Sequence, residues 1–215
     1  MEKDLGNYRK SYDKGSLLEQ SINKDPFDLF QLWFNEVDMH FQETETNAMT
    51  LSTIGSDGFP KSRVVLLKKF NSFGFVFYTN YESEKAKALA NTPQCCLSFH
   101  WESAERQVII KGIADKIDPS ESDAYFLSRP KGSQLGAWAS KQSTVIENRA
   151  ILDTQLQSLE NEYKNKPLNR PEFWGGYIVK PVEIEFWQGR ANRLHDRIRF
   201  KLSTNNCWDM DRLSP

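Results

Sequence analysis

The sequence has few of the features that mark secreted, membrane or metal-binding proteins. Its 215 residues include three cysteines, Cys95, Cys96 and Cys207, and no pair has the spacing of a metal site or a redox motif. We interpret them as reduced thiols of a cytosolic protein. No apolar run approaches about 18 residues, and the N-terminus lacks the apolar core of a signal peptide. We therefore expect a cytoplasmic protein without a membrane partner.

Net charge is also nearly absent, at -1. Such a chain has no global field that would draw it to nucleic acid, so any anion site must be built from local residues. The three histidines, His40, His100 and His195, are too scattered for a metal site, and we expect no metal. The motifs GxSxG, GxxxxGK[ST] and GxGxxG are missing, which leaves serine hydrolases, P-loop proteins and Rossmann proteins without support.

Aromatic residues and short β-rich segments are plentiful. Asp25 and Pro26 predict a helix start, because aspartate caps a helix and proline suits its first position. We predict helices at residues 27–41, 82–91, 119–128 and 144–164. We predict strands at residues 49–53, 62–69, 75–79, 94–101, 107–117, 176–180, 182–187, 193–202 and 207–212.

Many short strands joined by tight turns, such as the one at residues 55–58, indicate a closed or nearly closed barrel. The expected class is mainly β with peripheral helices (α+β). We expect residues 1–24 to form a flexible N-terminal arm and residues 25–215 to form a single domain, because no change in composition marks a second one.

The segment at residues 193–202, RLHDRIRFKL, is the most informative. If it forms one strand, one face carries Arg193, His195, Arg197, Arg199 and Lys201. A bound phosphate would relieve the repulsion among these groups, since guanidinium forks match phosphate oxygens. The alternative is a solvated outer face with acidic neighbours across the strand pair, and the segment alone does not distinguish the two.

Two other groups could bind an anion. Arg63 and Lys68 stand at the two ends of an apolar strand, where they could instead be charges flanking a core strand. Gln107 lies on a predicted strand, and Gln142 and Ser143 open the last predicted helix. Hydroxyl and backbone N–H groups at a helix start bind phosphate, although ordinary capping is the alternative.

A last group combines an aromatic ring, a cation and a hydroxyl. Tyr125 and Arg129 are four residues apart and share one face of a predicted helix. Ser133 follows in a segment that we expect to be a glycine-containing loop. The three would suit a phosphorylated aromatic ring, and a surface tyrosine–arginine pair is the alternative.

Taken in order, these segments resemble the pyridoxine (pyridoxamine) 5′-phosphate oxidase family over nearly the whole chain. The segment RLHDR at residues 193–197 is the most specific. The other segments that carry the resemblance are RVVLLK at 63–68, FYTN at 77–80, ERQV at 105–108, YFLSRP at 125–130, SQLGAWASKQS at 133–143, FWGGY at 173–177 and EFWQG at 185–189.

The resemblance implies a split β-barrel FMN-binding fold that works as a homodimer, with FMN at the subunit interface. Matched by motif, the FMN contacts fall on Arg63, Val64, Val65, Leu66, Leu67, Lys68, Tyr78, Thr79, Lys85, Gln107, Gln142, Ser143, Trp187 and Arg197. The substrate contacts fall on Arg9, Tyr12, Lys68, Tyr125, Arg129, Ser133, Arg193, Leu194 and His195.

The resemblance also implies a reaction in B6 vitamer salvage and biosynthesis. Pyridoxine 5′-phosphate and pyridoxamine 5′-phosphate would be oxidised to pyridoxal 5′-phosphate by hydride transfer from C4′ to flavin N5, and O2 would reoxidise the flavin and give H2O2. No side chain is such an electron acceptor, whereas a flavin is. Arg193 and His195 would be the catalytic pair that holds the pyridine ring against the flavin.

One position departs from the family pattern. Where relatives commonly have a basic residue before the lysine that matches Lys85, this chain has Glu84. Either the carboxylate turns outward or another cation compensates for it, and we expect weaker FMN binding than in relatives with a basic residue there.

Two rival interpretations remain. One is a split-barrel flavin protein that does not use B6 vitamers, such as a flavin reductase or a cofactor carrier. The other is a barrel that binds single-stranded nucleic acid through the basic strand face. The substrate-type residues Tyr125, Arg129 and Ser133 argue against the first, and the net charge argues against the second.

Overall fold

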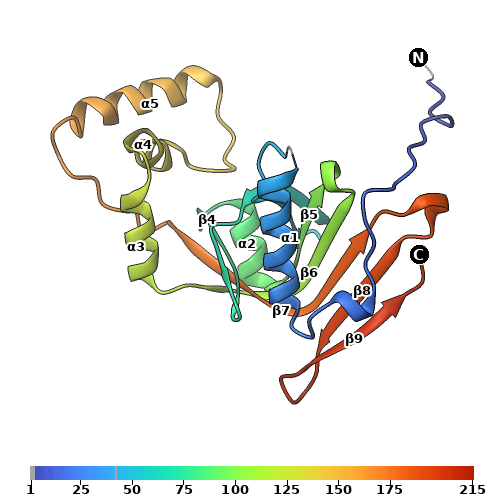
Figure 1. Ribbon diagram of the computed structural model, residues 1–215. Helices are drawn as coiled ribbons and strands as arrows, with labels where there is room; N and C mark the ends of the chain where they lie inside the picture. The colour runs from blue at the N-terminus through green and yellow to red at the C-terminus, as the bar shows by residue number, and fades with distance from the viewer. Residues whose placement is uncertain (1–2, 42) are drawn as a thin grey trace. The chain divides into compact units, whose positions relative to one another are not determined.

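The computed structural model describes residues 3–41 and 43–215, so the first two residues of the predicted arm lie outside it. In this described part the chain contains nine strands and five α-helices, which confirms the predicted mainly-β class (Figure 1). The helices are α1 (Pro26–His40), α2 (Glu84–Asn91), α3 (Pro119–Ser128), α4 (Lys131–Ala139) and α5 (Arg149–Glu162). Short 3-10 turns lie at η1 (Glu19–Ser21), η2 (Glu102–Ala104) and η3 (Ala191–Arg193).

The strands form one hydrogen-bonded sheet. They are β1 (Ala48–Ile54), β2 (Pro60–Leu66), β3 (Lys69–Asn71), β4 (Gly74–Asn80), β5 (Gln94–Trp101), β6 (Arg106–Lys116), β7 (Trp174–Gln188), β8 (Asp196–Leu202) and β9 (Trp208–Leu213). Neighbours follow the order β2-β1-β5-β6-β7-β4-β3, while β8 pairs with β7 and β9 pairs with β8. The β3–β4, β4–β7, β7–β8 and β8–β9 pairs are antiparallel.

The chain divides into two compact units, and each is described here by itself. The first comprises the N-terminal part up to Met49, Leu97–Lys111 and Pro181–Pro215. The second comprises Thr50–Cys96 and Gly112–Lys180. The boundaries fall within β1, β5, β6 and β7.

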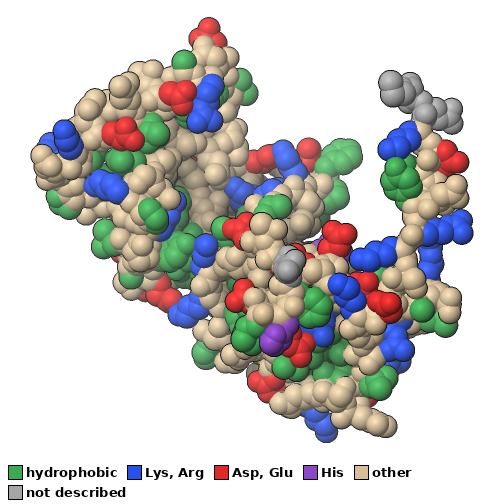
Figure 2. All heavy atoms as spheres, turned by 45° about the horizontal axis from the view of Figure 1, so that its top comes forward, with side chains coloured by type: hydrophobic (Ala, Val, Ile, Leu, Met, Phe, Trp, Pro, Cys, Tyr) green, Lys and Arg blue, Asp and Glu red, His purple; other side chains and the backbone are tan. Residues whose placement is uncertain are grey.

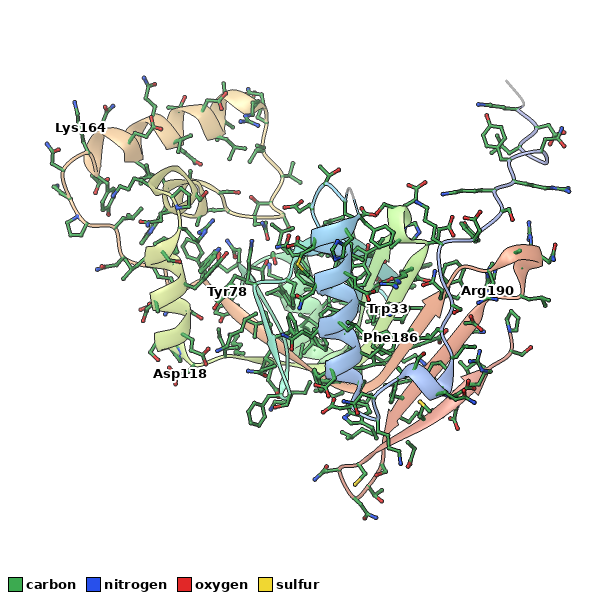
Figure 3. The ribbon with its side chains drawn as sticks, viewed as in Figure 1. Trp33, Tyr78, Asp118, Lys164, Phe186 and Arg190 are labelled. Carbon is green, nitrogen blue, oxygen red and sulfur yellow. The ribbon has the colours of Figure 1, made fainter. Side chains whose placement is uncertain are left out.

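Helix α1 supplies much of the core of the first unit. It begins where the sequence predicts, because the Asp25 side chain accepts a hydrogen bond from the Phe27 N–H and Pro26 occupies the first turn. Its buried face is aromatic, with Phe30 stacking edge-on against Phe99 at 5.2 Å between ring centroids. Trp33 meets Phe186 of β7 in the same way at 5.3 Å (Figure 3). These rings tie the helix to β5 and β7.

The second unit is built around β4 and the first half of β7. Their register runs from Phe75 opposite Val179 to Asn80 opposite Trp174. The FWGGY segment needs its glycines, because a Cβ at Gly175 would collide with the Tyr81 ring. Helices α3 and α4 close a second cluster of buried side chains, made of Phe126, Leu135, Leu168 and Trp174.

Several predicted elements need correction. Helix α4 covers residues that we expected to be a loop, because Leu135 is buried by tertiary packing that overrides the two glycines of the segment. Helix α5 begins at Arg149 rather than at residue 144, has no buried residue, and leaves Val145 fully exposed before it. The strands expected at 176–180 and 182–187 are one strand, since the proline between them falls after the ladder with β4 and before the ladder with β8.

The basic segment also differs from the expectation. The strand β8 starts at Asp196, and the residues before it form the turn η3, where Asn192 and Arg193 have positive φ angles of 57° and 61°. Arg193 and His195 therefore do not share a strand face with Arg197. No helix in the described residues is both long and apolar enough to cross a membrane.

Candidate functional site

A pocket of about 670 Å³ lies in the second unit. Strands β2 and β4, helices α2 to α4 and the segment after α4 supply its walls. Eleven of the predicted site residues line it: Val64, Val65, Leu66, Lys68, Tyr78, Thr79, Lys85, Tyr125, Arg129, Ser133 and Gln142. We call this the first pocket.

Arg129 is the most unusual residue of the first pocket. It follows the last turn of α3, and its guanidinium lies 4.6 Å from the ring centroid of Trp174. Its Nη1 atom is buried and has no hydrogen-bond partner among the described residues. Burial lowers the pKa of Arg129, and the neighbouring Tyr125 partly opposes this shift. A buried cationic donor without a partner is costly, so the geometry suits an anionic ligand.

Lys85 forms a second cationic end of the first pocket. Its Nζ atom donates to Gln142 Oε1 at 2.7 Å and to the hydroxyls of Thr79 and Ser83 at 3.2 Å each. Burial and, to a smaller extent, the nearby Arg63 lower the pKa of Lys85 to about 8, while Glu84 partly opposes this shift. All three partners are neutral, so the ammonium keeps its charge available for an anion.

Aromatic rings line the pocket between these cations. Tyr78 and Tyr125 stack at 3.9 Å between centroids with an interplanar angle of 18°. Tyr78 also stacks on Trp174 at 5.5 Å, and it is labelled in Figure 3. Flat rings in this arrangement offer a surface for another planar ring. The first pocket thus combines an aromatic wall with two separate cationic groups.

Glu84, the residue that departs from the family pattern, forms an ion pair with a lysine. Its carboxylate accepts two hydrogen bonds from Lys61 Nζ at 2.7 and 2.6 Å, and both side chains are more than half exposed. The backbone N–H of Glu84 donates to Ser143 Oγ at 3.3 Å. Ser143 therefore lies at the start of α2, and the prediction that it opens the following long helix was wrong because residues 141–148 are not helical.

A second pocket of about 770 Å³ lies in the first unit. Five predicted site residues line it: Arg9, Tyr12, Trp187, Arg193 and His195. Tyr12 meets both Trp187 and His195 edge-on at 5.7 Å between centroids. The backbone N–H of Arg190, which is labelled in Figure 3, donates to His195 Nδ1 at 3.1 Å. The N-terminal segment and the turn before β8 thus meet around one histidine.

The other predicted residues lie outside both pockets. Leu67 is buried in the core, whereas Leu194 is 69% exposed. Gln107 donates to Ser98, and Arg63 donates to the Leu51 carbonyl and the Thr53 hydroxyl.

Two of the basic residues of β8, Arg197 and Arg199, are paired with acidic ones. Arg197 donates to Glu185 at 2.8 Å, which raises its pKa, and Arg199 donates to Asp211 at 2.7 Å. Acidic neighbours across the strand pairs belong to the alternative that we considered, whereas the expected contact of Arg197 with FMN stays a prediction. Acidic and basic side chains are also interspersed over the face drawn in Figure 2.

Sequence reasoning missed several residues of the first pocket. Trp174 stands in the FWGGY segment that we used for the resemblance, but no role was assigned to it. The others are Asn80, Pro130, Gly136, Ala137 and Ser140. The last four flank or belong to the unpredicted helix α4, so the missed helix accounts for them.

Comparison with known proteins first defines the class. A pyridoxamine 5′-phosphate oxidase-related, FMN-binding protein from Nostoc punctiforme matches with a TM-score of 0.69 at 12% identity, covering 91% of this chain and 99% of that one. PhzG from Burkholderia lata, solved in complex with tetrahydrophenazine-1-carboxylic acid, matches with a TM-score of 0.86 at 28% identity, covering 96% and 100%. The fold is the split barrel of such proteins, as predicted.

The sequence comparisons define the family. The family model described as pyridoxamine 5′-phosphate oxidase matches residues 36–161, and that of the pyridoxine 5′-phosphate oxidase C-terminal dimerisation region matches residues 174–215. A pyridoxine/pyridoxamine 5′-phosphate oxidase from Flavobacterium johnsoniae is 60% identical over 211 residues, which cover 98% of this chain and 99% of that protein. The chain belongs to the pyridoxamine 5′-phosphate oxidase family.

Proposed function

We propose that this protein oxidises pyridoxine 5′-phosphate and pyridoxamine 5′-phosphate to pyridoxal 5′-phosphate with FMN as its cofactor. The single observation that carries the proposal is the buried Nη1 of Arg129, which has no partner among the described residues and lies beside the rings that line the first pocket. A planar ring that bears a phosphate would stack on these aromatic rings, and its phosphate would accept a hydrogen bond from the Nη1 of Arg129.

The first pocket also fits the phosphate of FMN. Lys85 is a largely buried cation whose three hydrogen-bond partners are neutral oxygens, and the adjacent Glu84 is engaged by Lys61. When bound, FMN would supply the electron acceptor for the hydride from C4′, and O2 would regenerate it with release of H2O2. The proposed FMN contacts are those implied by the family resemblance, with Lys85, Thr79 and Gln142 at the phosphate.

The chain's own residues would bind and orient the substrate. Lys68, Tyr125, Arg129 and Ser133 would hold the phosphate, since all four line the first pocket. Arg193 and His195 would hold the pyridine ring, and Arg9 and Tyr12 of the N-terminal arm would cover it. The protein contributes position and charge rather than redox chemistry.

A homodimer is part of the proposal. The proposed substrate residues are divided between two pockets, and the family model of the dimerisation region spans Trp187, Arg193 and His195 of the second pocket. This supports active sites to which both subunits contribute.

The test is to release and identify the chromophore of the purified protein, and then to measure H2O2 release with each vitamer. We expect FMN, turnover of both phosphorylated vitamers, and an Arg193→Ala variant that keeps FMN but loses most turnover. A protein that is colourless and cannot be reconstituted with FMN would refute the proposal. A yellow protein that releases no peroxide with either vitamer would favour a flavin reductase or a cofactor carrier.

The shared site is tested by mixing subunits. Arg129→Met and Arg193→Ala each damage one pocket, so each homodimer should have little activity at a substrate concentration well below KM. If both subunits contribute to a site, a hybrid dimer of the two variants has one site with both arginines intact and regains activity. Hybrids that stay inactive would place each complete site within one subunit.

A further inference from the structure

Glu105 is a buried carboxylate to which the family resemblance assigns no role. It is the first residue of the ERQV segment, between η2 and β6, and it is only 2% exposed. Its backbone has the left-handed conformation, with a φ angle of 56°. A buried carboxylate is stable only where charged or hydrogen-bonding groups compensate for its lost hydration. The identity of those groups indicates what the residue does.

Among the described residues, the partners of the Glu105 carboxylate all come from the N-terminal arm. Its Oε2 atom accepts hydrogen bonds from the backbone N–H groups of Asp13 at 2.8 Å and Lys14 at 3.1 Å. Its Oε1 atom lies 3.6 Å from Lys10 Nζ. Lys14 Nζ reinforces the contact by donating to the Ser103 carbonyl at 2.7 Å. Hydrogen bonds to an ionised carboxylate are about twice as strong as neutral ones, so this one side chain holds the arm at three residues, Lys10, Asp13 and Lys14.

The anchored segment includes the arm residue of the second pocket. Tyr12 directly precedes Asp13, and its ring packs against Trp187 and His195. Gly189 permits this approach, because a Cβ there would lie 2.9 Å from the Cβ of Tyr12 and 3.1 Å from that of Glu105. The Gly189 N–H also donates to the Glu105 carbonyl at 2.8 Å. Glu105 thus joins the wall of the pocket to the arm that covers it.

The arm has a second attachment further along the chain. The Leu17 N–H donates to Asp196 Oδ2 at 3.0 Å, and the Leu17 side chain is buried. Figure 1 shows this part of the N-terminal segment beside β8. Loss of the Glu105 contact would therefore release residues up to 14 without detaching the arm.

We propose that Glu105 is a positioning residue, a latch that holds the N-terminal arm so that Tyr12 covers His195 in the second pocket. The inference rests on the proposed function, because it assigns the latch to substrate binding. Glu105 itself does not line the pocket and would act only through the arm. The substrate class it serves is the phosphorylated pyridine, whose ring the arm would cover.

The test compares Glu105→Gln with two other variants of the full-length, FMN-loaded protein. Glutamine keeps the size of the side chain but removes the charge and places an amide donor opposite the arm's donors. Lys10→Met removes the ion pair between Lys10 and Glu105. The Lys10 side chain is more than half exposed, so this substitution should not prevent folding. Glu102→Gln is the matched control, because Glu102 is an exposed carboxylate only three residues away.

Two readouts separate a latch from a general structural role. The first is trypsin cleavage after Lys14, a site that all three variants keep, which we expect to be much faster in Glu105→Gln, moderately faster in Lys10→Met and unchanged in Glu102→Gln. The second is steady-state kinetics with pyridoxine 5′-phosphate, for which we expect KM to rise about tenfold in Glu105→Gln with FMN content unchanged.

Unchanged cleavage of the arm in both latch variants would overturn the proposal, as would faster cleavage with an unaltered KM. If Glu105→Gln does not fold, Lys10→Met alone decides between the same outcomes. If the wild-type protein turns over no vitamer, the proposed function fails, while the cleavage experiment still tests whether Glu105 holds the arm.

Discussion

Replacing Arg129 by methionine should move ligand affinity and protein stability in opposite directions. In the substrate-free protein the Nη1 atom of Arg129 is buried without a hydrogen-bond partner among the described residues. Methionine removes that donor but keeps an apolar, polarizable side chain against the Trp174 ring. The variant therefore loses a hydrogen bond to the ligand. It also loses a buried donor that, in the ligand-free protein, has no hydrogen-bond partner among the described residues.

The magnitudes of the two effects, on KM and on the free energy of unfolding, follow from the environment of the Arg129 guanidinium. A hydrogen bond to a charged group contributes about 1.5–3 kcal/mol, so the loss of one phosphate contact of about 2 kcal/mol raises KM roughly 30-fold. An unsatisfied buried polar group costs about 1–3 kcal/mol, so removing it should leave the free energy of unfolding unchanged or raise it by about 1 kcal/mol. The lowered pKa of Arg129, caused mainly by burial, is consistent with such a cost.

The assay pairs peroxide release at varied pyridoxine 5′-phosphate with thermal unfolding of the FMN-loaded, substrate-free protein. The control is Arg149→Met, because Arg149 is highly exposed, pairs with Asp153 on α5 and lines neither pocket. We expect the control to change neither quantity. A variant at position 129 with KM within twofold of wild type, or with a clearly lower unfolding temperature, would refute the reasoning.

Four further predictions concern the cofactor site, the stability of the FMN-free protein and the ring-binding histidine. Because burial lowers the pKa of Lys85 to about 8, the free site loses its ammonium charge above that pH; titrations should show an FMN dissociation constant that is flat below pH 8 and then rises by up to about tenfold per pH unit. By the same shift the unfolded chain holds more protons than the folded one above pH 8, so the stability of the FMN-free protein should rise with pH there. Glu84→Arg should lower the FMN dissociation constant a few-fold, and an unchanged or higher value would contradict the expected weakening by the acidic residue. Since Arg190 donates its N–H to His195 Nδ1, ¹⁵N NMR of the neutral imidazole should find its proton on Nε2, and a proton on Nδ1 would exclude that hydrogen bond.

The elements that the sequence predicted best are those defined by local signals. Helix α1 begins behind Asp25 because capping and proline geometry act over two or three residues. The strand β5 and the helix α3 have the predicted bounds, since alternation and a proline start are equally local. Much of the first pocket could also be assembled from the sequence, because the family resemblance supplied the motifs that line it.

What the sequence did not reveal depends on contacts between distant segments. Helix α4 contains two glycines, and only the burial of Leu135 in tertiary packing explains why it is helical. The turn at Arg193 interrupts a segment whose alternation is that of a continuous strand. Glu105 stands in the ERQV segment that contributed to the resemblance, but its role could not be predicted from the sequence, because its partners lie more than ninety positions earlier in the chain.

The arginines illustrate why composition and periodicity cannot assign an anion site. Arg197 and Arg199 belong to the most basic segment, yet carboxylates from neighbouring strands neutralise them. Arg129 stands in an unremarkable segment, and its buried Nη1 has no partner among the described residues; the buried Nε of Arg199 has none either, but the Arg199 guanidinium is already paired with Asp211. An arginine can bind an anionic ligand only where no carboxylate of the protein already pairs with it. Strand pairing, rather than the local sequence, decides which arginines are paired in this way. The same rule applied to carboxylates separates Glu84, paired with a surface lysine, from Glu105, whose partners lie in the arm.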